Sequence, residues 1–189
     1  MLLKTIRTTA ALAAVSLLAA CSSMPGMGKP IVQPCPEYFI LEEAATLTKF
    51  QDGPGRDLID IEYLSQIRTI AMECVSDIDK DTKTGEMVVR LAPVLGVELG
   101  AAFNNQETTI RTFVAVINPE DKILYREQLD VPVSFSGNRT RLVLTAPPTA
   151  IVLPINPEIA SRYYRVYGGF ALTPEQLEYN RKKIEEKLR

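Results

Sequence analysis

Residues 110–135 read IRTFVAVINPEDKILYREQLDVPVSF, and this stretch decides the fold class. The first eight residues are rich in β-branched side chains and almost wholly apolar, as in the central strand of a sheet. From Ile123 onward apolar residues alternate with polar ones, which is the period of a half-buried strand. The Asn-Pro-Glu-Asp sequence at 118–121 is typical of a turn. The stretch therefore predicts a β-hairpin.

Similar strand-like runs occur on both sides of this hairpin. They are separated by clusters of Gly, Pro, Asn and Asp, which favour turns. Seven or eight strands predict a single antiparallel β-sandwich over residues 35–172, and we expect the immunoglobulin-like type, although its core tryptophan is missing. The fold class is therefore mainly β. The flanking runs are Tyr38–Leu41, Leu58–Val75, Met87–Leu99, Thr140–Thr145, Ile151–Ile155 and Tyr163–Leu172.

The pattern becomes helical near the C-terminus. Thr173 is suited to cap a helix that begins at Pro174, and Gln176 completes a capping box. We expect an amphipathic helix over residues 173–189 with a thin apolar stripe. This stripe favours docking on the chain's own sandwich, and contact with a partner protein is the alternative. The stripe consists of Leu177, Ile184 and Leu188.

Residues 1–20 have the features of a bacterial lipoprotein signal peptide. Lys4 and Arg7 are followed by an apolar run that is too short to cross a bilayer. The Leu-Ala-Ala-Cys sequence that ends at Cys21 resembles a lipobox, which implies that Cys21 is acylated and becomes the mature N-terminus. Because the next residue is Ser22 and not Asp, we expect an anchor in the outer membrane, on its periplasmic face. The Pro- and Gly-rich residues 21–34 predict a flexible tether.

The two remaining cysteines, Cys35 and Cys74, form an even pair in a chain that we expect to be exported. An oxidising compartment favours a disulfide between them. We expect Cys35 to start the first strand and Cys74 to end the second, because antiparallel neighbours would bring these two ends together. A catalytic or metal-binding thiol pair is the alternative, but the chain lacks both a Cys-x-x-Cys spacing and histidine.

The composition excludes several classes of function. None of the 189 residues is histidine, which removes the Ser-His-Asp and Cys-His constellations and most transition-metal sites. Without the signal peptide the chain carries nineteen basic and twenty-three acidic side chains, a net charge of about −4. This balance argues against a nucleic-acid partner, which would need a concentrated basic surface. We predict no cofactor and no resident metal.

Three alternating carboxylates, Asp77, Asp79 and Asp81, are arranged as in a calcium-binding loop. The rest of that pattern is missing, because an EF-hand would need Gly where Thr82 stands and Glu where Val88 stands. We therefore favour a polar hairpin tip that links the strands predicted at 58–75 and 87–99.

Asp57, Asp60 and Glu62 carry the alternative enzymatic hypothesis. A pair of carboxylates about 5–10 Å apart is what glycoside hydrolysis requires. The chain would then be a lipid-anchored periplasmic hydrolase. A solvated strand face explains the same three residues and is the interpretation that we favour.

Two further groups have both functional and structural interpretations. Arg139 and Arg141 flank the start of a predicted strand and would suit a phosphate or carboxylate, although a turn with solvated arginines explains them as well. Tyr163, Tyr164 and Tyr167 would form an aromatic platform for a sugar or peptide, whereas alternating tyrosines in a last strand more often pack in the core or along an edge. We favour the structural interpretation of both groups.

Several short motifs together resemble a group of small lipoproteins from α-proteobacteria. These motifs are the lipobox, Pro34-Cys35-Pro36, the Gly-Pro-Gly-Arg-Asp turn at 53–57, Cys74, the Gly-Asn-Arg-Thr turn at 137–140 and the segment 169–177. The resemblance covers most of the mature chain and implies an envelope location and a single domain. It supplies no catalytic residue. We expect a non-enzymatic binding or scaffolding module with an envelope protein as its partner.

Overall fold

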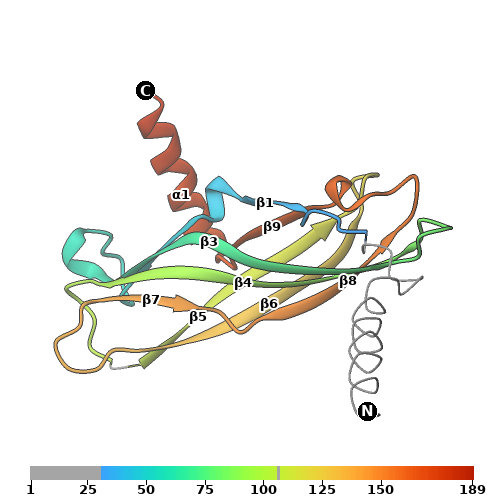
Figure 1. Ribbon diagram of the computed structural model, residues 1–189. Coiled ribbons are helices and arrows are strands. Elements are labelled where there is room, and N and C mark those ends of the chain that lie inside the picture. The colour runs from blue at the N-terminus through green and yellow to red at the C-terminus, as the bar shows by residue number, and fades with distance from the viewer. Residues whose placement is uncertain (1–30, 106) are drawn as a thin grey trace, which may run out of the picture. The chain divides into compact units, whose positions relative to one another are not determined.

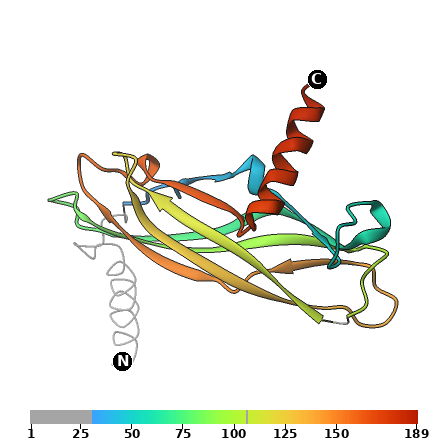
Figure 2. The same ribbon diagram turned by 180° about the vertical axis from the view of Figure 1, so that it is seen from behind.

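The computed structural model describes residues 31–105 and 107–189 as two β-sheets and one C-terminal helix. Figures 1 and 2 show the sheets as two layers, with helix α1 (Pro174–Lys187) standing out from one side. The predicted mainly β fold and the C-terminal helix are confirmed, and the layout is that of a β-sandwich. The predicted signal peptide, Cys21 and the first part of the tether lie outside the described residues.

Sheet A has the strand order β1-β9-β5-β6. The hairpin predicted from residues 110–135 is present, because β5 and β6 pair antiparallel along their length. The apolar strand β5 lies inside the sheet, between β9 and β6, as its sequence predicted. The strands of sheet A are β1 (Glu37–Ile40), β5 (Glu107–Ile117), β6 (Ile123–Ser134) and β9 (Arg165–Phe170).

Sheet B is built around one long hairpin, in which β3 pairs with β4. Strand β2 pairs with the other edge of β3, while β7 and β8 pair with successive parts of β4. The strands of sheet B are β2 (Thr46–Phe50), β3 (Ile61–Ile78), β4 (Gly85–Leu99), β7 (Arg141–Thr145) and β8 (Thr149–Ile155). Short 3₁₀ turns are η1 (Glu42–Ala44), η2 (Leu58–Asp60) and η3 (Ser161–Tyr163).

Both sheets contribute to one apolar core. Alternate residues of each strand point inward, since the side chains of a strand alternate between its two faces. The inward residues are large and almost completely buried. The opposite face of each sheet points away from the core. Examples are Met87, Val89, Leu91 and Leu95 of β4 and Ile110, Val114 and Val116 of β5.

The predicted disulfide Cys35–Cys74 is present, with 5.6 Å between the two Cα atoms. The strand pairing that we expected around it is wrong. Strand β1 pairs with β9, and in parallel orientation, because the chain leaves sheet A after β1 and crosses to sheet B, where β2 takes the place beside β3. The disulfide therefore joins the segment that leads into sheet A to a strand of sheet B.

The last predicted tether residues lie against the sandwich. Ser76 Oγ of β3 donates to the carbonyl oxygen of Ile31 at 3.2 Å, and Ser161 Oγ donates to Gln33 Oε1 at the same distance. The chain therefore joins the folded domain beside the end of β3 that carries Cys74. Within the described part of the chain, no helix has the length and apolar character that a membrane span requires.

Candidate functional site

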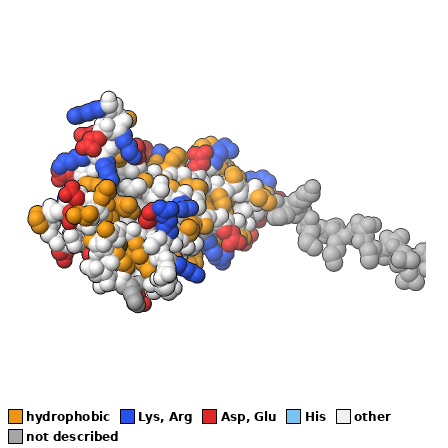
Figure 3. Space-filling model, turned by 90° about the vertical axis from the view of Figure 1, so that its left-hand side faces the viewer, with side chains coloured by type: hydrophobic (Ala, Val, Ile, Leu, Met, Phe, Trp, Pro, Cys, Tyr) orange, Lys and Arg blue, Asp and Glu red, His pale blue; other side chains and the backbone are white. Residues whose placement is uncertain are grey.

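A groove of about 610 Å³ lies between the C-terminal half of α1 and the outward face of sheet B. Its floor comes from β2, β3, β4 and β7, and α1 forms one wall. Figure 3 shows charged side chains on the projecting helix and hydrophobic side chains on the surface below it. The groove is the candidate functional site. Residues that line it include Leu64, Arg68, Val143, Lys183, Ile184 and Leu188.

The wall of the groove begins at a strong helix cap. Gln176 N donates to Thr173 Oγ1 at 3.3 Å, and Thr173 N donates to Gln176 Oε1 at 2.9 Å, so the predicted capping box is confirmed. Pro174 is the first helical residue. These bonds satisfy two backbone groups that a helix start otherwise leaves unpaired.

A buried amide fixes α1 to the crossover segment, which we define as residues 41–46, from the end of β1 to the first residue of β2. The side chain of Asn180 is only 4% exposed. Its Nδ2 donates to the carbonyl oxygens of Glu43 and Thr46, at 2.8 Å each. Both donors of the amide nitrogen are thereby used, and two backbone acceptors of the crossover are satisfied.

Aromatic and ionic contacts support the same attachment. The Phe50 ring of β2 meets the Tyr179 ring edge to face, with 5.3 Å between centroids. Arg181 Nε and Nη2 donate to the Glu43 carboxylate at 3.1 and 3.0 Å. This bidentate pair lowers the pKa of Glu43 and raises the pKa of Arg181. The first half of α1 is therefore held on the chain's own body.

The second half of α1 forms the wall of the groove and leaves the groove accessible. Ile184 is half-buried, and Leu188 is 83% exposed. Docking of the helix on its own sandwich is thus confirmed, but the docking side chains are those of residues 179–181. Of the predicted stripe, Leu177 is half-buried near the cap, whereas Ile184 and Leu188 line the groove.

A β-bulge directs Arg68 across the floor of the groove. Ile67 pairs with Leu95 and Thr69 pairs with Val94, so Arg68 is an extra residue without a partner on β4. The guanidinium lies over Gly96, where an added Cβ atom would be 2.7 Å from Arg68 Nε. Gly96 therefore leaves the space that the Arg68 side chain fills. Bulges commonly re-aim a side chain in this way.

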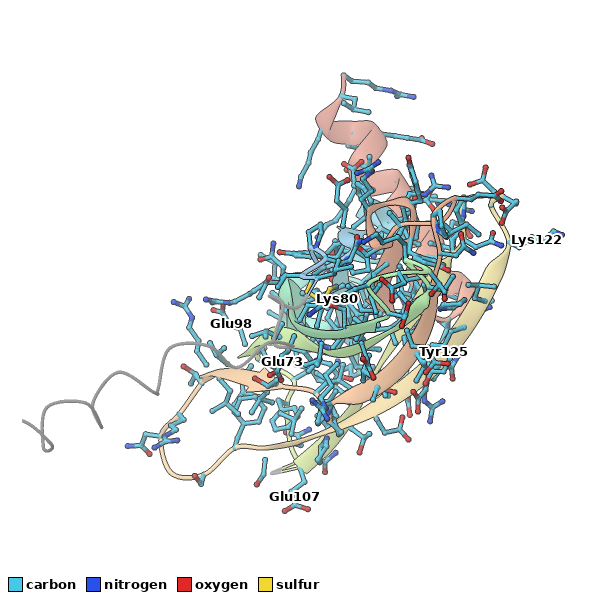
Figure 4. All side chains as sticks on the ribbon, turned by 45° about the vertical axis from the view of Figure 1, so that its right-hand side comes forward. Glu73, Lys80, Glu98, Glu107, Lys122 and Tyr125 are labelled. Atoms are coloured by element: carbon cyan, nitrogen blue, oxygen red, sulfur yellow. A yellow bond between two sulfur atoms is a disulfide. The ribbon has the colours of Figure 1, made fainter. Side chains whose placement is uncertain are left out.

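The charges around the groove are unequal. Its lining includes the basic residues Arg68, Arg141, Lys183 and Lys187 but only two acidic ones, Glu42 and Glu98. Arg141 Nη2 donates to Glu98 Oε1 at 2.7 Å, which raises the pKa of Arg141 and neutralises Glu98. Figure 4 shows Glu98 on the side of the body below α1. The lining thus carries a surplus of positive charge.

The three carboxylates of the hydrolase hypothesis have structural roles. Asp60 Oδ1 accepts from Gln51 Nε2 at 2.8 Å, and its Oδ2 accepts from the backbone N of Asp57 at 2.9 Å. Glu62 forms an ion pair with Lys49 at 3.9 Å. Asp57 and Asp60 belong to the 3₁₀ turn η2 and its cap, and our expectation of a strand at this point is wrong. None of the three acids lines the groove beside α1 or the pocket at the loop that follows β6.

The predicted turn at 53–57 is held by its own arginine. Arg56 Nη1 donates to the carbonyl oxygens of Gly53 and Gly55 at 2.8 and 2.6 Å. Gly53 has a φ of 134°, which favours glycine. The Arg56 guanidinium also lies over the Phe50 ring, 5.3 Å from its centroid. This loop is therefore held by Arg56 and contacts β2 through the Phe50 ring.

The alternating aspartates form the hairpin tip that we favoured. Asp79 Oδ1 accepts from Asp81 N at 3.0 Å, from Thr82 N at 2.8 Å and from Thr82 Oγ1 at 2.9 Å. These bonds, chiefly the one from the Thr82 backbone, lower the pKa of Asp79. The tip joins β3 to β4. Among residues 31–105 and 107–189, no group of three or more Cys, Asp or Glu side chains is placed to hold a metal ion.

The two predicted arginines line different pockets. Arg141 is paired with Glu98 in the groove. Arg139 lines a separate pocket of about 420 Å³ at the loop that follows β6, beside Phe103 and Phe135. The structure therefore does not bring the two guanidinium groups together on one anion.

The three predicted tyrosines do not share a surface. Tyr163 is exposed in η3. Tyr164 is buried, and its hydroxyl donates to the carbonyl oxygen of Pro154 at 2.6 Å. Tyr167 stacks on Phe39 of β1, with 5.4 Å between ring centroids. Core and edge packing, the interpretation that we favoured, accounts for Tyr164 and Tyr167.

Comparison with known protein families, curated proteins and solved structures finds no match to this chain. The resemblance to α-proteobacterial lipoproteins therefore stays an expectation from short motifs.

Proposed function

We propose that the protein is a lipid-anchored envelope lipoprotein that binds a partner protein in the groove beside α1. The groove carries the proposal, because an open, partly apolar surface beside a firmly attached helix is typical of a binding site. The volume of about 610 Å³ falls within the range of about 300–1,000 Å³ that is common for ligand pockets. The lipobox-like sequence and the disulfide support export and anchoring.

The positions of tether and groove along β3 support this arrangement. Ile31, where the described chain begins, is bonded to Ser76, whereas the groove includes β3 residues 64–68. A strand rises about 3.3 Å per residue, so about 25–40 Å separates the two positions. A domain anchored through Cys21 would carry its groove at the end remote from the tether. That end would be accessible to proteins of the surrounding compartment.

We also propose the immunoglobulin-like type for the sandwich. Nine strands within the described residues match the strand number of a variable-type domain. An experimental structure that could be superposed on immunoglobulin domains would test the assignment.

The anchor is tested by Cys21→Ser. We expect the variant to lose labelling by radioactive palmitate and to leave the outer-membrane fraction, because thioether formation needs the cysteine sulfur. Replacement of Ser22 by alanine is the matched control and should change neither result. Undiminished palmitate labelling of Cys21→Ser would refute the lipoprotein hypothesis.

The binding surface is tested by chemical crosslinking in cells with Ile184→Ser combined with Leu188→Ser. We expect this double variant to fold normally and to lose a crosslinked product that the parent protein gives. Ile123→Ser combined with Leu124→Ser is the matched control, because it also replaces two apolar side chains at the surface, at the start of β6. A product that survives the first pair and disappears with the second would show that binding occurs elsewhere.

A further inference from the structure

We propose that the occupant of the groove is an acidic, partly apolar polypeptide segment, and that Arg68 binds one of its carboxylates. The inference rests on the proposed function and adds the chemistry of the partner. Three features carry it: the orientation of Arg68, the exposed apolar side chains around it, and the surplus positive charge.

Arg68 is oriented for recognition rather than for folding. The bulge and the absence of a side chain at Gly96 lay its guanidinium on the groove floor. No carboxylate within residues 31–105 and 107–189 forms a salt bridge with Arg68. The planar guanidinium therefore keeps its donors for an outside acceptor, and a carboxylate matches their geometry with two parallel bonds.

Apolar side chains surround this guanidinium on three elements. Leu64 of β3 is 37% exposed, Val143 of β7 is 59% exposed, and Leu188 ends the helix wall. Val143 pairs in register with Gly96, the residue under Arg68. A segment that lies across this floor would bury apolar side chains within reach of the arginine. Burial of such surface contributes about 25 cal/mol per Å² before the costs of association.

The remaining charges favour an acidic occupant over a neutral or basic one. Lys183 and Lys187 extend along the helix wall, while Glu98 is already paired with Arg141. An occupant with several carboxylates would meet complementary potential along its length, which raises the rate of encounter and fixes the register.

A polypeptide fits this site better than an anionic lipid headgroup does. The groove lies about 25–40 Å along β3 from the point where the tether joins the domain. The segment that leads to the proposed anchor joins the domain at the other end of β3, beside Ser76.

The test is fluorescence anisotropy with the full-length chain, purified in detergent micelles. The probe is a labelled eight-residue peptide of alternating leucine and glutamate. The comparison peptide has glutamine in place of glutamate. We expect the acidic peptide to bind, the glutamine peptide to bind at least tenfold more weakly, and Arg68→Gln to weaken the acidic peptide about tenfold to hundredfold, as expected for a charged hydrogen-bonded pair. Arg139→Gln, which lies outside the groove, is the matched control and should leave the affinity unchanged.

Four results would overturn the inference. Equal affinity for the two peptides would show that carboxylates are not recognised, and an unchanged affinity of Arg68→Gln would remove its assigned role. Arg68-dependent binding of vesicles of phosphatidylglycerol, together with no binding of either peptide, would assign the groove to lipid headgroups. If neither peptide binds but the groove-dependent crosslink persists in cells, the acidic partner is wrong and the proposed function stands.

Discussion

The two ends of β3 are held in different ways. At the end near Ser76, the disulfide of Cys74 and the hydrogen bond to Ile31 tie the strand to the start of the domain. At the other end, the core face of β3 is more deeply buried, while the outward face holds the bulge at Arg68 and the open groove. We call the first end the tether end, and it is held by a disulfide and a hydrogen bond. We call the second end the groove end, and its outward face is accessible to a binding partner.

The largest expected effect comes from removing the restraint of the tether end. Cys35→Ala combined with Cys74→Ala opens a loop of 39 residues, and the chain-entropy account gives a loss of about 4 kcal/mol in the free energy of unfolding. Urea denaturation followed by circular dichroism measures it. A double variant as stable as the oxidised parent would show that the tether end needs no covalent restraint.

The next effect concerns the attachment of the groove wall. Asn180→Ala removes the two hydrogen bonds that the buried amide donates to the carbonyl oxygens of Glu43 and Thr46, which costs about 1–3 kcal/mol. For a chain of this size we expect a melting temperature lower by about 3–8 °C in calorimetry. Asn138→Ala, at an exposed turn, should leave it unchanged. If the two variants have the same melting temperature, the Asn180 amide does not hold α1.

A smaller, pH-dependent effect is expected from Glu43. Arg181 lowers the pKa of this carboxyl below its ordinary value of 4.5. A carboxyl whose pKa is lower in the folded state contributes stability above its unfolded pKa and loses it as the pH falls through the folded value. Glu43→Gln should therefore flatten the fall in melting temperature below about pH 4.5, with a small amplitude because the pair is exposed. Asn138→Ala, which removes no titratable group, should retain the parent's slope.

The smallest expected effect is at the groove itself. Leu188→Ser should change the free energy of unfolding by no more than about 0.5 kcal/mol, because the side chain is exposed and touches solvent on most sides. Chemical denaturation of the purified variant measures this. A loss above about 1 kcal/mol would mean that the helix end packs on the body and that the groove is closed in solution.

Local patterns in the sequence predicted much of the fold. The apolar run of β5, the alternation in β6 and the turn between them predicted the hairpin that forms the middle and edge of sheet A. The capping box at Thr173 predicted the start of α1, since its bonds join neighbouring residues. Such features depend on contacts within a few residues of each other, and a single sequence displays them directly.

Contacts between distant segments were not predictable in this way. We did not predict strand β2, because its Thr and Lys residues interrupt the apolar alternation. The parallel pairing of β1 with β9 has no signal in the local sequence. Asn180 looks like any polar helix residue until the crossover segment lies beside it. The bulge at Arg68 depends on a one-residue shift against β4, which only the pairing of the two strands reveals.

The most direct test of the central claim compares two valines on the outward side of sheet B. A photoreactive amino acid is placed in living cells either at Val143, at the groove, or at Val75, at the tether end of β3; these residues are 59% and 55% exposed. Crosslinked products are then identified by mass spectrometry. The account predicts a discrete protein adduct from position 143 that Arg68→Gln diminishes, and no matching adduct from position 75. Equal products from the two positions, or a discrete adduct from position 75 alone, would contradict a binding site at the groove.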